Sequence, residues 1–158
     1  MTEPTLYGLA GALMNMALQA LADNGLAVPA RQVVYIGQIP ADCEQLAVVF
    51  DGWSPTPPQD GMVVCQTYRW GASFTVLVTR SCVPGITNAK SLPKAADMSR
   101  TAEIASNDAE ALLDVVSMAG EHDGGSVAVS ITPPQGGLQS TMLNITVPVT
   151  RGMVWLPT

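Results

Sequence analysis

The longest alternation of apolar and polar side chains in this chain runs from Thr67 to Cys82 and predicts an unusually long strand. The two sides of that strand consist of Phe74, Val76 and Val78 on one side and of Thr75, Leu77 and Thr79 on the other. Strands in globular domains have about 5–6 residues, and this one has room for about twice that number. A strand of this length in a small domain indicates that it has further strands to pair with.

Two other segments repeat apolar residues at three- and four-residue steps, which predicts amphipathic helices. The first covers about residues 3–23, with Thr2 as the N-cap and Asn24-Gly25 as a left-handed stop. The second covers about residues 97–119 and ends at Gly120. The predicted apolar stripes are Leu6, Leu9, Leu13, Met14, Ala17, Leu18 and Leu21 in the first helix, and Met98, Ala102, Ala105, Ala109, Leu112, Leu113 and Val116 in the second.

Four shorter strands are predicted around the long one. They cover about residues 32–36, 45–50, 126–131 and 140–149. Prolines and glycines predict an irregular loop at residues 51–62, and a tail follows at residues 152–158. The order α-β-β-β-α-β-β predicts a single α+β domain over residues 1–158. We expect a mixed, mostly antiparallel sheet of about five strands with both helices packed on it.

The charge content changes this picture more than the hydrophobic content does. Charged residues make up 13% of the chain, about half of the usual share of ≈ 25%. A surface with so few charges favours an oligomer, because subunit interfaces are depleted in charge. The net charge is −6 and no dense Lys/Arg cluster is present. Tight binding to phosphates is therefore not expected, although an acidic wall would let DNA slide past without sticking.

Residue types that carry chemistry are scarce. Cys43, Cys65 and Cys82 contain no CxxC pair and have only His122 as a fourth ligand, so buried reduced thiols are favoured over a metal site. His122 lies in a glycine-rich turn, where a solvated side chain is favoured over a general base. No phosphate-binding loop or nucleophile elbow occurs. The sequence predicts no enzyme, no cofactor and no metal.

The start of the chain does not indicate export. Residues 1–4 lack the basic n-region of a signal peptide. The apolar run at residues 6–21 is interrupted by Asn15 and Gln19 and is shorter than the ~20 residues of a bilayer span. We expect no membrane anchor.

Three acids of the second predicted helix, Asp108, Glu110 and Asp114, have two interpretations. A solvated acidic face is favoured, since most charged runs are solvated. The alternative is that these acids line a negatively charged channel in an oligomer.

Six residues of the loop and the tail are candidate contacts with partner chains, because tryptophan in irregular segments often anchors an interface. They are Trp53, Pro57, Pro58, Met153, Trp155 and Leu156. The alternative for Trp53 and Trp155 is that each folds back onto its own core.

The chain resembles the small head-to-tail joining proteins of long-tailed (siphovirus-type) phages, and in particular the tail terminators of actinobacterial phages. The resemblance is carried by residues 43–48 (CEQLAV), 74–84 (FTVLVTRSCVP) and 107–114 (NDAEALLD), by Gly136-Gly137 and by the order of the elements. It implies a ring, usually a hexamer, that caps the last ring of the tail tube and presents a surface to the head connector. DNA would pass through without specific binding, and no catalytic residues are implied.

The expected function is therefore that of a structural virion protein at the phage neck, assembled in the host cytoplasm. Its expected partners are copies of itself, the tail-tube protein and the head-connector protein. Alternatives within this class are a head-completion or connector protein and a tail-tube subunit. An alternative from another class is a small cytoplasmic ligand-binding domain or enzyme with a pocket under the proline-rich loop.

Overall fold

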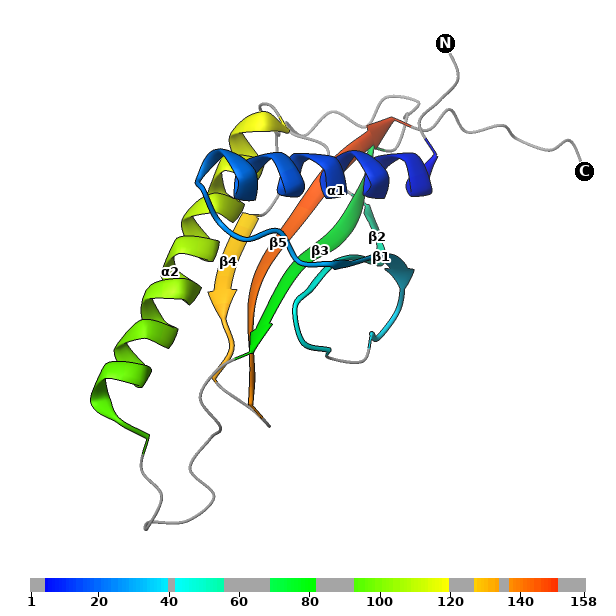
Figure 1. The fold of residues 1–158 in the computed structure, drawn as a ribbon. Coiled ribbons are helices and arrows are strands. Elements are labelled where there is room, and N and C mark those ends of the chain that lie inside the picture. Colours follow the sequence, from blue (N-terminus) through cyan, green and yellow to red (C-terminus); the bar gives the residue numbers. More distant parts are fainter. Residues whose placement is uncertain are drawn as a thin grey trace, which may run out of the picture.

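The computed structural model describes residues 5–39, 42–55, 69–81, 93–119, 127–133 and 137–150. The elements follow one another as two helices and five strands (Figure 1). They are α1 Leu6–Asp23, β1 Arg31–Ile36, β2 Gln45–Pro55, β3 Arg69–Ser81, α2 Ala95–Met118, β4 Val127–Ile131 and β5 Leu138–Thr150. This arrangement confirms the predicted α+β class and the order α-β-β-β-α-β-β.

The five strands form one sheet in the order β1-β2-β3-β5-β4. β1 is parallel to β2, and all other neighbours are antiparallel. The predicted long strand is β3, which has 13 residues and lies at the centre between β2 and β5. Its length is explained by two partners, because the register with β5 extends from Arg69–Thr150 to Ser81–Leu138.

Both helices contribute to a core on one face of the sheet, where α1 crosses the strands and α2 lies along β4 and β5 (Figure 1). Alternation along β3 places Phe74, Val76 and Val78 on this face, and each is at most 1% exposed. Leu21 of α1 and Leu112 of α2 meet them in the same cluster. Of the two sides predicted for β3, the one with Phe74, Val76 and Val78 is therefore the side that faces the helices.

α1 follows its predicted stripe, although it begins later than expected. Its N-cap is Thr5, whose Oγ1 accepts a hydrogen bond from the Gly8 amide at 3.0 Å, so the predicted cap at Thr2 is wrong. At the other end Gly25 adopts φ 68°, the left-handed conformation expected for a helix stop. The buried residues are Ala10, Leu13, Met14, Ala17, Ala20 and Leu21.

The face of α2 that packs on the sheet differs from the predicted one. Its buried residues are Ala105, Asp108, Ala111, Leu112 and Val115. Two members of the predicted stripe, Met98 and Leu113, are instead 52% and 51% exposed. The observed and predicted faces share Ala105 and Leu112, and the observed face also contains a charged residue, Asp108.

β2 continues through the first part of the loop predicted at residues 51–62. The register with β3 shifts between Phe50 and Gly52, where Gly52 adopts φ 156°, and pairing then resumes as far as Pro55. Trp53, half-buried, packs edge-on against Phe50 with ring centroids 5.7 Å apart. The loop prediction is therefore wrong for residues 51–55, and residues 56–62 lie outside the described part of the chain.

Hydroxyl and amide pairs join β3 to β5 on the face of the sheet opposite the helices. The pairs are Ser73–Thr146 at 3.1 Å, Thr75–Asn144 at 2.8 Å and Thr79–Ser140 at 2.9 Å. Such cross-strand pairs each stabilise a sheet by about 0.2–1 kcal/mol. They also fix the register of the two longest strands.

Gly71 is placed where β2, β3 and β5 come close together. A Cβ at this position would lie 2.5 Å from Cγ2 of Thr146 and 3.3 Å from Oγ of Ser54. We expect Gly71→Ala to lower the free energy of unfolding by about 1–3 kcal/mol, because overpacking forces side chains and backbone to shift. Urea denaturation measures this change.

The matched control for Gly71 combines the same change with Thr146→Ser. Serine lacks the methyl group that the new Cβ would meet but keeps the hydroxyl that pairs with Ser73. We expect the double variant to recover most of the loss. If Gly71→Ala is as stable as the wild type, the close approach at this position is not tight.

Candidate functional site

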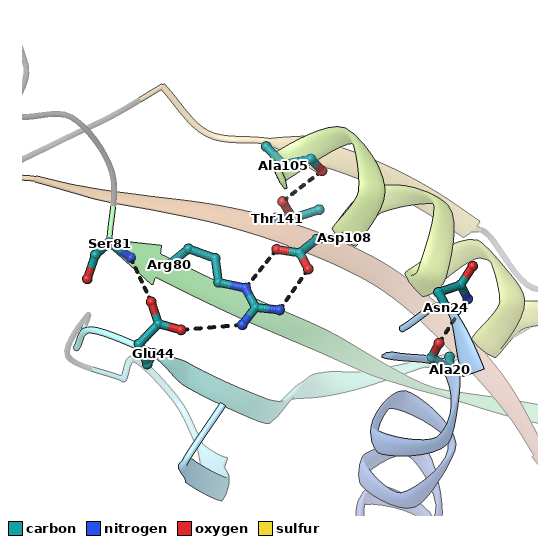
Figure 2. A network of polar contacts seen from close by, with 8 residues as sticks. All are labelled: Ala20, Asn24, Glu44, Arg80, Ser81, Ala105, Asp108 and Thr141. Atoms are coloured by element: carbon teal, nitrogen blue, oxygen red, sulfur yellow. Dashed lines mark hydrogen bonds and ion pairs between the residues drawn. The ribbon is translucent and has the colours of Figure 1, made fainter. Parts of the chain in front are cut away.

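A network of ion pairs connects α2 to the sheet (Figure 2). Arg80, near the end of β3, donates from Nε to Oδ2 of Asp108 at 3.0 Å and from a terminal nitrogen to Oδ1 at 2.9 Å. Arg80 is 8% exposed and Asp108 is 1% exposed. This paired geometry uses both carboxylate oxygens and holds the guanidinium plane in one orientation.

Glu44 supplies the outer part of this network. Its carboxylate lies 3.3 Å from the remaining terminal nitrogen of Arg80 and accepts a hydrogen bond from the Ser81 amide at 3.3 Å. Glu44 immediately precedes β2 and adopts φ 53°, which is uncommon for a residue other than glycine. The network thus joins the start of β2, the end of β3 and the middle of α2.

The electrostatics of this network keep Arg80 charged. Burial alone would lower the pKa of Arg80, but hydrogen bonds and charge attraction from Asp108, and then from Glu44, raise the pKa above its ordinary value. The ion pair of Arg80 and Asp108 holds α2 on the sheet, since each charge neutralises the other.

An open depression adjoins the network, between the end of β3, the first half of α2 and the start of β5. It is lined by Arg80, Ser81, Thr101, Ile104, Ala105, Asp108, Gln139 and Thr141. The charged groups in this lining already have internal partners, and Thr141 donates to the Ala105 carbonyl oxygen at 3.5 Å. The depression therefore offers no uncommitted charge to a ligand.

Asp108 does not belong to an acidic face, so the interpretation of this residue as solvated or channel-lining is wrong. The physical reason is its ion pair with Arg80, which makes burial of the carboxylate tolerable. Glu110 and Asp114 are exposed. Asp114 accepts a hydrogen bond at 2.9 Å from Nδ2 of Asn24, the C-cap of α1, and so links the two helices.

The other chemistry-bearing residues form no site in the described ranges. No group of three or more His, Cys, Asp or Glu residues there is arranged to hold a metal ion. Cys43 is exposed rather than buried, in the turn before β2, so the expectation of a buried thiol is wrong for this residue. Cys65, Cys82 and His122 lie outside the described residues.

Large apolar side chains are exposed at both edges of the sheet. At the β1 edge Tyr35 is 50% and Ile36 is 75% exposed, and at the β4 edge Val127 is 40% and Ile131 is 44% exposed. Natural edge strands are usually protected by charges or proline. Neither edge strand contains proline or lysine, and the one charge, on Arg31, is paired with Asp42 at 2.7 Å.

The first half of α2 adds to this exposed apolar surface. All of residues 95–104 except Thr101 are exposed, including Met98 and Ile104. Leu113 and Met118 are exposed further along the same helix, and Tyr7 is exposed on α1. The buried part of α2 begins only at Ala105.

Of the six predicted contact residues, only Trp53 lies in the described part of the chain, where it packs partly against its own core. Pro57, Pro58, Met153, Trp155 and Leu156 lie outside it. The sequence analysis did not single out Tyr35, Ile36, Val127 or Ile131. Both strands are short and largely apolar, but their sequences alone do not show that they are edge strands.

Comparisons with protein-family models and with curated proteins give no match. Among the described residues, neither helix is both long and apolar enough to span a membrane. The candidate functional surface therefore rests on the geometry of the chain itself: two open, apolar sheet edges and the exposed half of α2.

Proposed function

We propose that this chain is a structural virion protein that forms a ring at the head–tail junction of a long-tailed phage. The ring caps the tail tube, presents its other side to the head connector and lets DNA pass through its centre. In this role the protein acts by surface complementarity, and it needs no catalytic residue, cofactor or metal.

The observation that carries this proposal is the pair of exposed apolar edges on opposite sides of one sheet. Tyr35 and Ile36 at β1 and Val127 and Ile131 at β4 would be a liability in an isolated monomer. Two different edges on one subunit allow a head-to-tail contact, and such contacts produce rings when the rotation between subunits closes. The α+β fold and the order of its elements agree with those implied by the resemblance to tail terminators.

Charge supports the same role. The net charge of −6 and the scattered basic residues favour passage of DNA over its retention. Glu110 and Asp114 remain exposed acids that are available to face a channel.

Imaging of purified particles tests the proposed function. Particles of the phage that encodes this chain, labelled with an antibody against it, should carry the label at the neck in copies consistent with one ring. Particles from cells that lack the chain should have tails of irregular length or heads without tails. Label along the whole tube identifies a tube subunit, and particles without label contradict a virion protein.

The alternative of a small cytoplasmic enzyme or ligand-binding domain predicts a different outcome. Such a protein would be absent from the particles and would gain thermal stability with a metabolite. The depression beside Arg80 is the place to look for such binding, and its internally paired charges do not favour it.

A further inference from the structure

We infer that copies of this chain associate head to tail, with β4 of one copy pairing antiparallel with β1 of the next. The inference deepens the proposed function, because it names the contact that would close the ring. It rests on the register of the sheet, the exposure of its edges and the directions of its strands.

The register connects the two edges through continuous rows of side chains on the helix-covered face. One row passes through all five strands as Ile36, Phe50, Phe74, Ile145 and Val127. The next row is Val34, Val48, Val76, Leu143 and Val129. The interior members of both rows are core residues or pack against the core, so the rows are apolar from edge to edge.

The first row ends in exposed residues, whereas the ends of the second row, Val34 and Val129, are half-buried. Ile36 is 75% exposed at one end of the first row, and Val127 is 40% exposed at the other. Consider a second copy placed beside the first so that the helices of both copies lie on the same side of the continuous sheet. This placement would bring Ile36 of one copy next to Val127 of the other, and Val34 next to Val129. Each row would then continue into the next subunit, and the exposed ends would be buried.

The directions of the strands fit this placement. β1 and β2 run in the same direction, and each later step across the sheet reverses it, so β4 runs opposite to β1. A neighbouring β1 beside β4 therefore forms an antiparallel pair, which satisfies the outward amide and carbonyl groups that no other described strand pairs with. The strands have six and five residues, so the two edges match in length.

The partner is a second copy because the β1 edge and the β4 edge match each other in apolar alternation, in length and in strand direction. An unrelated strand would have to reproduce the apolar alternation, the length and the direction that the opposite edge of the same protein already has. Pairing of β1 with β1, or of β4 with β4, would bury only one kind of edge and leave the other exposed.

Charge-swap variants test the contact in the full chain. Ile36→Lys and Val127→Glu each place a charge at the end of the first row, and each should raise the concentration needed for assembly by roughly tenfold or more. The double variant places a lysine of one copy opposite a glutamate of the next, and it should regain assembly. Multi-angle light scattering and native mass spectrometry measure the assembled mass.

Matched controls separate charge from loss of folding. Ala22→Lys and Ala22→Glu place the same charges at an exposed position on α1, outside both edge strands, and should leave the assembled mass unchanged. Circular dichroism and urea denaturation of every variant identify any that does not fold. For such a variant, Tyr35→Lys on β1 and Ala128→Glu on β4 take the place of the first pair, because these two exposed residues end one row on the opposite face of the sheet.

Several results would overturn the inference. The first is a wild-type chain that remains monomeric at the highest soluble concentration. The second is an oligomer whose mass is the same in the wild type and in both single edge variants. The third is a double variant that stays dissociated. The last result would indicate pairing of like edges. An oligomer that is unaffected by the edge variants contradicts this contact but not the location at the neck. Particles without label contradict the proposed function but not this contact.

Discussion

Replacing Asp108 with alanine is expected to lower the free energy of unfolding by about 3–5 kcal/mol, because it leaves a buried arginine without its partner. Asp108 is 1% exposed and holds Arg80 through contacts of 2.9 and 3.0 Å. Glu44 remains as a partner, but its contact with Arg80 is longer, 3.3 Å, and its side chain is 48% exposed. Urea denaturation, with the midpoint and the slope measured separately, gives the change.

Two further variants make this prediction specific to the buried pair. Glu110→Ala removes an exposed acid from the same helix and should change stability by no more than about 0.5 kcal/mol. The double change Arg80→Met with Asp108→Leu removes both charges and should recover most of the loss, since apolar residues often replace buried ion pairs without cost. A loss for Asp108→Ala no larger than that for Glu110→Ala would contradict the docking role of the pair.

Phe74→Ala is expected to destabilise the protein by about 3–5 kcal/mol, the usual loss when a buried aromatic side chain is truncated. Phe74 is 1% exposed in the middle of β3, and its ring lies 5.6 Å from the ring of Phe50 on β2. The position is at the centre of the row that passes through all five strands. Thermal and urea unfolding of the purified variant measure the effect.

The control for Phe74 lies on the opposite face of the same strand. Leu77 is half-buried there, so Leu77→Ala should cost clearly less than Phe74→Ala. Equal losses at the two positions would show that both faces of β3 are covered to the same extent in solution, contrary to this fold.

The sequence predicted those elements whose patterns depend only on burial. Alternation along β3 separated Phe74, Val76 and Val78 from the opposite face because the central strand has its main core on one side. The three- and four-residue steps of α1 identified Leu13, Ala17 and Leu21 because that helix buries an ordinary apolar stripe.

The sequence predicted the helix α2 and two of its buried residues, Ala105 and Leu112, but it missed the buried ion pair of Asp108. Asp108 looked like a surface residue because its partner, Arg80, is 28 positions earlier in the chain. No local pattern reveals such a pair, and the predicted apolar stripe therefore omitted Asp108 and included Met98 and Leu113, which are exposed. β2 was predicted too short for a similar reason, since a bulge at Gly52 lets pairing with β3 resume after an interruption in the alternation.

The exposed edges could not be identified from the sequence because edge position is a property of topology. β1 and β4 have ordinary strand compositions, and only the order β1-β2-β3-β5-β4 shows that both are outermost. In addition, charged residues that pair within the chain leave less free charge on the surface. Arg31 and Arg80, two of the seven basic residues, are both engaged within the chain and so contribute little free charge to the surface.

The position of β5 has a consequence for the timing of biosynthesis. Residues 138–150 form an interior strand between β3 and β4, although they are the last of the described strands to be translated. Until the ribosome has released them, β3 lacks one neighbour and β4 has no place in the sheet. Nascent chains therefore cannot complete this sheet before β5 has been translated.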